Sequence, residues 1–158
     1  MNTIVKKIPT AARVLLGLIF TVFGLNGFLH FLPQPPMQPG PALTFIVGLL
    51  GTGYFFPLLK ATEVTAGLLL LSNRFVPLAL TVLAPIVINI VAFHAFLAPG
   101  GIPLALVVLA LEGYLAWTLR GVFAPVLRAR TDAAVSPARS ASSSSAAPLA
   151  GVQSPASR

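Results

Sequence analysis

The chain has 158 residues, of which 56% are hydrophobic and only 8% are charged, and its mean hydropathy is +0.92. A soluble domain carries about 25% charged residues, so these few charges cannot cover a surface that faces water. The composition therefore excludes an ordinary soluble domain and indicates an integral membrane protein, whose first partner is the lipid bilayer.

The formal net charge is +7, which on a soluble protein would point to nucleic acid. Here the Lys and Arg residues other than Lys60 flank or follow apolar runs, as they do in the cytoplasmic loops of membrane proteins. We therefore expect no nucleic-acid partner. The sequence has no cysteine, which excludes disulfides, thiolate metal sites and iron–sulfur clusters within the chain.

The first expected elements are a cytoplasmic N-terminus over residues 1–10 and a membrane span over residues 11–32. The apolar run is long enough to cross a bilayer, which takes about 20 residues. It is also longer than the apolar core of a signal peptide, which has about 7–15 residues, so we expect it to be retained. The uncharged, proline-rich segment 33–41 ends the helix.

The next stretch, residues 42–71, is too long for one untilted span and too short for two. Because Gly51 and Gly53 interrupt it, we expect a short interfacial helix over 42–54 and the second span over 55–71. The third and fourth spans are expected over 75–97 and 102–119, with Pro85 inside the third.

The fold class predicted from these elements is an all-α membrane protein, a four-helix transmembrane bundle formed by residues 11–127. Basic residues mark both ends of the bundle sequence and the turn at 72–74, whereas the linkers 33–41 and 98–101 carry no charge. Both termini are therefore expected in the cytoplasm. The Ser-, Ala- and Pro-rich segment 128–158 is expected to be a disordered cytoplasmic tail.

Three ionisable residues lie inside the expected spans, namely Lys60, Glu63 and Glu112. Each costs about 2.5–3.5 kcal/mol to insert, so such residues usually face the interior of a bundle. Lys60 and Glu63 are three residues apart on one helix and are expected to pair. A rise of about 1.5 Å per residue places both glutamates near mid-membrane and a more polar layer in the outer half.

The candidate polar site combines these three ionisable residues with the histidines and asparagines of the more polar layer in the outer half. Structural explanations stay open for each member: a Lys can extend to the interface, Asn can bond helices together, and an ion pair can fix helix register. No catalytic residue and no metal site are assigned. The small residues Gly17, Gly24, Gly27, Ala66, Gly67 and Gly113 predict close helix contacts. The candidate site residues are Lys60, Glu63, Glu112, His30, His94, Asn26 and Asn89.

Part of the sequence resembles the DoxX family of small bacterial membrane proteins. The resemblance rests on PLLKATEVTAG at 57–67, NRFVPLA at 73–79 and APIVIN at 84–89 leading to Phe93-His94, together with Trp117 and Arg120. It covers residues 13–127 and omits the tail. It implies a four-helix bundle in the bacterial inner membrane, a link to membrane redox complexes, and a match between Glu63 and an acidic position of the family.

Three functions are consistent with these patterns. The first is an accessory subunit of a redox complex that contacts quinone, with Lys60, Glu63, His30 and His94 as hydrogen-bond partners and Glu112 as a proton relay. It requires a membrane or soluble redox partner; two histidines without a supporting motif do not predict haem. The second is a non-catalytic scaffold or assembly factor. The third, a pathway for small solutes or protons, requires a homo-oligomer. No self-contained catalytic motif is present, so an enzymatic activity is left open.

Overall fold

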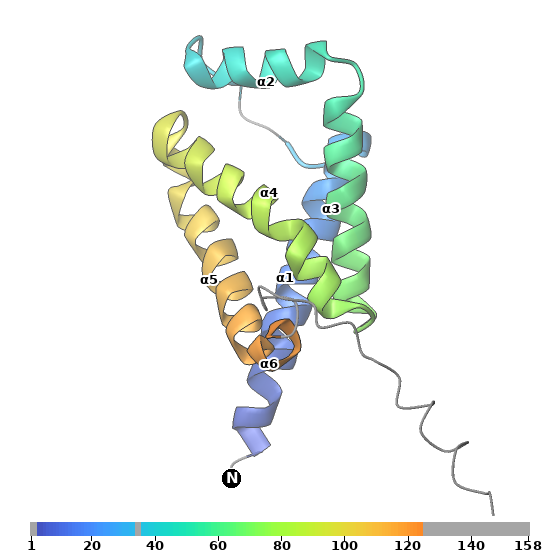
Figure 1. Ribbon diagram of the computed structural model, residues 1–158. Helices are drawn as coiled ribbons and strands as arrows, with labels where there is room; N and C mark the ends of the chain where they lie inside the picture. The colour runs from blue at the N-terminus through green and yellow to red at the C-terminus, as the bar shows by residue number, and fades with distance from the viewer. Residues whose placement is uncertain (1–2, 34–35, 125–158) are drawn as a thin grey trace, which may run out of the picture. The chain divides into compact units, whose positions relative to one another are not determined.

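The computed structural model describes residues 3–33 and 36–124 (Figure 1). Every regular element in this part of the chain is helical, so the predicted all-α class is confirmed there. The tail expected over 128–158 lies outside the described residues. The helices are α1 (Thr3–Leu29), α2 (Pro41–Gly51), α3 (Phe55–Leu71), α4 (Val76–Phe96), the short 3-10 helix η1 (Pro99–Gly101), α5 (Ile102–Thr118) and α6 (Arg120–Phe123).

Within residues 3–33 and 36–124, three helical segments are long and apolar enough to cross a membrane, namely Lys7–Leu29, Val76–Phe96 and Pro99–Thr118. The 17 residues of α3 reach the required length only together with α2, and those two helices are bent by 91° at their junction. A helix of this size is about 25 Å long, slightly less than the hydrocarbon core of a bilayer. The chain therefore has the long apolar helices of a multi-pass membrane protein, with three or four candidate spans in its described part.

The observed ends of α3, α4 and α5 lie within one residue of the predicted spans. The first helix differs, because it begins at Thr3 with Pro9 inside it and ends at Leu29 rather than at residue 32. His30 follows in the left-handed conformation, with φ 50°. A helix can extend beyond the membrane at one end and stop early at the other, so the limits of an apolar run do not fix its ends.

The short helix α2 lies across the end of the molecule where α3 begins and α4 ends (Figure 1). It was predicted over 42–54 and is observed over Pro41–Gly51, with Pro41 in its first turn. The bend into α3 is made by residues 52–54, where Gly53 takes a φ of 74° that favours glycine. None of the residues of α2 is fully buried.

Helices α1 and α3 run antiparallel and pack closely along their length (Figure 1). A Cβ built on Gly17 would lie 3.0 Å from the carbonyl oxygen of Gly67, and one built on Gly67 would lie 2.9 Å from that of Gly17. The predicted role of these glycines in close helix contact is confirmed. The same prediction for Gly113 is wrong, because no neighbouring atom lies within 4 Å of a Cβ built there.

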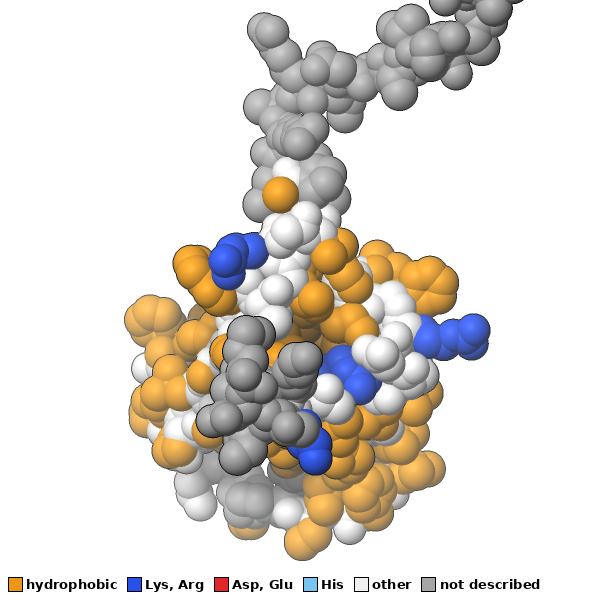
Figure 2. Space-filling view, turned by 90° about the horizontal axis from the view of Figure 1, so that it is seen from below, with side chains coloured by type: hydrophobic (Ala, Val, Ile, Leu, Met, Phe, Trp, Pro, Cys, Tyr) orange, Lys and Arg blue, Asp and Glu red, His pale blue; other side chains and the backbone are white. Residues whose placement is uncertain are grey.

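The described Lys and Arg side chains gather at one end of the molecule, with Lys60 as the exception. Lys7 and Arg13 lie in the first half of α1, Arg74 in the α3–α4 turn, and Arg120 at the start of α6. Figure 2, which views the molecule from that end, shows basic side chains around it and hydrophobic side chains over the flanks. This is the distribution expected of helices surrounded by lipid, with one basic face.

Candidate functional site

A cavity of about 790 Å³ lies between α2, α4 and the halves of α1, α3 and α5 that are remote from the basic end. Most of its wall is apolar and contains six phenylalanines. Four of the seven candidate site residues line it, on α3 and α4. The phenylalanines are Phe20, Phe23, Phe45, Phe55, Phe56 and Phe93, and the polar residues are Lys60, Glu63, Asn89 and His94.

The predicted ion pair is present in this cavity, since Lys60 Nζ lies 2.8 Å from Glu63 Oε2. The two side chains are 18% and 5% exposed. Lys60 Nζ also lies 5.6 Å from the centre of the Phe56 ring, a cation–π distance. Glu63 Oε1 forms no hydrogen bond within the described part of the chain, so it remains available as an acceptor.

Two glycines of α1 make room for the helix that carries this pair. A Cβ on Gly24 would lie 3.2 Å from Glu63 Cβ, and a Cβ on Gly27 would lie 2.5 Å from Lys60 Cγ. Alanine at either position would therefore press on one member of the pair. The glycines that the sequence identified as packing residues also position the polar site.

His94 contributes an imidazole ring that is held by a contact with the backbone. Its Nδ1 lies 3.0 Å from the carbonyl oxygen of Ala98, which can only accept, so Nδ1 donates. In the neutral ring Nε2 is then an acceptor. Gly101 lies against the imidazole, and any Cβ at that position would collide with it.

Two further candidate site residues, Asn26 and His30, lie at the C-terminal end of α1 in different surroundings. Asn26 is buried and its Oδ1 accepts a hydrogen bond of 2.7 Å from the backbone N–H of Leu32. His30 is exposed and lies beyond the end of α1. Neither residue lines the cavity. The side chain of Asn26 satisfies the backbone just past the helix, which is a structural role.

Glu112 also lies outside the cavity wall, on α5. It is 6% exposed, and neither carboxyl oxygen has a hydrogen-bond partner among the described residues. Ala105 and Val108, which precede it by seven and four residues on the same face of the helix, do line the cavity. Glu112 therefore lies one helical turn beyond the cavity wall, toward the basic end of the molecule.

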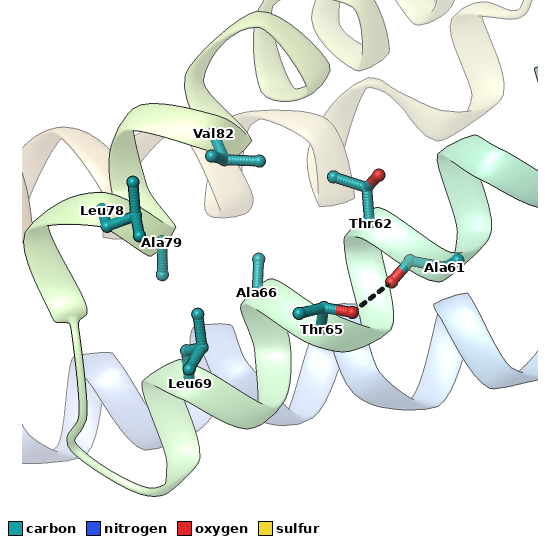
Figure 3. Close-up of a pocket in the computed structure, with 8 residues that line it drawn as sticks. All are labelled: Ala61, Thr62, Thr65, Ala66, Leu69, Leu78, Ala79 and Val82. Atoms are coloured by element: carbon teal, nitrogen blue, oxygen red, sulfur yellow. Dashed lines mark hydrogen bonds between the residues drawn. The ribbon is translucent and has the colours of Figure 1, made fainter.

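A smaller pocket of about 310 Å³ lies between α3 and α4 (Figure 3). Its polar side chains are Thr62 and Thr65, whose hydroxyls donate to the carbonyl oxygens of Leu58 and Ala61 on their own helix. No ionisable group lines it. It offers a ligand little besides an apolar surface, and the larger cavity is the better candidate site.

Sequence reasoning did not find the aromatic wall of the cavity. Its phenylalanines come from four helices, and Phe45 reaches Phe93 only because α2 is turned across the end of α4, with ring centres 5.5 Å apart. No group of three His, Asp or Glu residues in the described part of the chain could hold a metal ion. The site is therefore an apolar cavity with an ion pair, an amide and an imidazole.

No family model, curated protein or solved structure matches this chain. The resemblance to the DoxX family stays a prediction.

Proposed function

We propose that this chain is a four-span protein of the bacterial inner membrane that binds the head group of a quinone in its cavity and serves as an accessory subunit of a membrane redox complex. The observation that carries the proposal is the Lys60–Glu63 pair in a phenylalanine-lined cavity. Ligand cavities are commonly about 300–1,000 Å³ and mostly apolar, with few polar groups that orient the ligand.

The proposed topology has α1, α3, α4 and α5 crossing the membrane and both termini in the cytoplasm. Arg13, Arg74 and Arg120 belong to one end, whereas the described residues 36–41 and 97–101 at the other end carry no charge. Cytoplasmic loops are enriched in Lys and Arg, which favours the basic end as the cytoplasmic one.

Reporter fusions test this topology. A reporter fused after Arg128 should be active in the cytoplasm, and one inserted at Gln38 should be active on the outer side. A periplasmic signal from the Arg128 fusion would refute the topology.

The polar groups of the cavity suit a flat ring with two oxygens. The Lys60 ammonium has three donors and Glu63 uses one, so donors remain for a ligand carbonyl. Asn89 offers both a donor and an acceptor. Phenylalanine rings supply broad apolar surfaces against which a ring can pack. A quinone dissolved in the bilayer has such a flat ring and two carbonyl oxygens. The electrons that reduce it would come from the partner protein.

Direct binding tests the proposal. Detergent-purified protein should bind short-chain ubiquinone or menaquinone analogues, and Lys60→Met and Asn89→Leu should each weaken binding. Loss of a hydrogen bond costs about 0.5–1.5 kcal/mol, or 1.5–3 kcal/mol with a charged donor, so we expect roughly 2- to 150-fold weaker binding. Ile88→Leu is the matched control, because Ile88 neighbours Asn89 in sequence but is 65% exposed and outside the cavity wall. No binding by the unaltered protein would refute quinone contact.

A scaffold or assembly factor is the second candidate, favoured by the way Lys60 and Glu63 satisfy each other and Asn26 satisfies Leu32. Removing one partner of a buried pair is strongly destabilising, whereas replacing both can be neutral. Under this function, Lys60→Met with Glu63→Gln should restore both thermal stability and partner retention. Under the quinone function, the double variant should regain stability and still fail to bind the analogue.

A further inference from the structure

Glu112 is a buried acid on α5, beside the cavity wall. Its two oxygens are inaccessible and have no hydrogen-bond partner among the described residues, and the Lys60–Glu63 contact is the one ion pair found there. A carboxylate in such a place has lost its hydration and gained no compensating charge. A neutral carboxylic acid avoids most of that penalty.

The charged and titratable groups on the helices around α5 are engaged elsewhere or lie at the basic end. On α1, Arg13 donates to the carbonyl oxygens of Leu70 and Leu71, and Lys7 lies nearer the N-terminus. His94 on α4 bonds Ala98 through Nδ1. Arg120 on α6 lies over the Trp117 ring at 4.9 Å. None of these groups forms an ion pair with Glu112.

We propose that Glu112 is a proton-binding site of the membrane domain, which holds a proton as a neutral carboxylic acid one helical turn below the cavity. Its ligand is the proton itself, and the inference does not depend on the identity of the molecule that the cavity binds. Glu112 lies four residues after Val108, which corresponds to about 6 Å along the helix axis. The acid is therefore a proton reservoir close to the cavity, on the side of the basic end.

The sequence permits a direct test on the unaltered protein, because Glu63 and Glu112 are its two glutamates. Protein labelled with ¹³C at the glutamate carboxyl carbons should give two NMR signals in detergent at neutral pH. We expect one at the shift of an ionised carboxylate and one at that of a neutral acid. Glu63→Gln should remove the ionised signal. Two ionised signals would overturn the proposal.

Infrared spectroscopy gives a second readout. The unaltered protein should show a carboxylic C=O band that shifts in D₂O and disappears in Glu112→Gln, while Glu112→Asp should keep it at a changed frequency. Because glutamine resembles the neutral acid in shape and charge, Glu112→Gln should fold with nearly unchanged thermal stability. Two results with Glu112→Gln would show instead that Glu112 is ionised and paired. They are a large loss of folded protein, or a spectrum that loses carboxylate bands and no carboxylic C=O band. Failure of quinone binding would leave these results unaffected.

Discussion

Gly27 of α1 lies against the methylene stem of Lys60 on α3, and a Cβ at Gly27 would be 2.5 Å from Lys60 Cγ. The same lysine places its Nζ 2.8 Å from Glu63 Oε2. The missing side chain of Gly27 therefore leaves the space in which Lys60 reaches its partner. The close packing of α1 and the ion pair on α3 therefore depend on the same contact.

Gly27→Ala should displace Lys60 and disrupt its pair with Glu63. Lys60 can turn away because its stem is flexible, so the loss of stability should be moderate, about 1–3 kcal/mol as for other overpacked sites. Thermal unfolding in detergent measures it. Gly113→Ala is the control: Gly113 is exposed within α5 with no neighbour within 4 Å, so alanine should be neutral or stabilise by about 0.5–1 kcal/mol. Equal stability of the two variants would contradict the proposed fit of Lys60 against α1.

Gly67→Ala should destabilise the protein more than Gly27→Ala. Its Cβ would lie 2.8 Å from the backbone nitrogen of Thr21 and 2.9 Å from the carbonyl oxygen of Gly17. Backbone atoms cannot turn aside, so α1 and α3 must separate. The same unfolding measurement should rank the variants Gly113→Ala, Gly27→Ala and Gly67→Ala in decreasing stability. If Gly67→Ala were as stable as Gly113→Ala, the contact between the two helices would be looser than this geometry requires.

The order and length of the helices were largely predictable, because they depend on local patterns. Glycine and proline residues interrupt the apolar sequence, and the resulting segments match α3, α4 and α5 closely. The Lys60–Glu63 pair also followed from spacing within one helix. The end of α1 did not, because it depends on the left-handed backbone of His30 and on the bond from Leu32 to Asn26.

The cavity could not be predicted, because it depends on the angles between helices. Asn89 and His94 are five residues apart, a spacing that does not by itself place them on one face of a helix, yet both line the cavity. The isolation of Glu112 could likewise not be predicted, because the sequence shows only that α5 itself contains no basic residue. Whether a neighbouring helix supplies a partner is decided by packing.

Arg13→Gln should weaken the end of α3. The Arg13 guanidinium donates to the carbonyl oxygens of Leu70 and Leu71, which lie in the last turn of that helix and carry its negative dipole end. Because Arg13 is partly exposed, we expect a loss of about 1 kcal/mol in the free energy of unfolding. Lys7→Gln removes a charge from the same helix, where the side chain is exposed, and should change stability little. An equal loss of stability in Arg13→Gln and Lys7→Gln would indicate an effect of net charge rather than of this contact.

The last prediction concerns α2, which borders the cavity and has no fully buried residue. Its Phe45 ring packs on Phe93 of α4, so Phe45→Ala should loosen the helix without unfolding the rest. An aromatic pair contributes about 0.5–1.5 kcal/mol, which predicts roughly 2- to 10-fold faster amide hydrogen exchange over residues 41–51. Val47→Ala, at a residue of α2 that is 56% exposed, is the control and should leave exchange unchanged.

Because the chain lacks cysteine, Ile90→Cys in the cavity wall adds a labelling site, and a maleimide should react with it faster in the Phe45→Ala background. Unchanged exchange and labelling in Phe45→Ala would mean that Ile46 and Leu49 hold α2 in place without the aromatic contact.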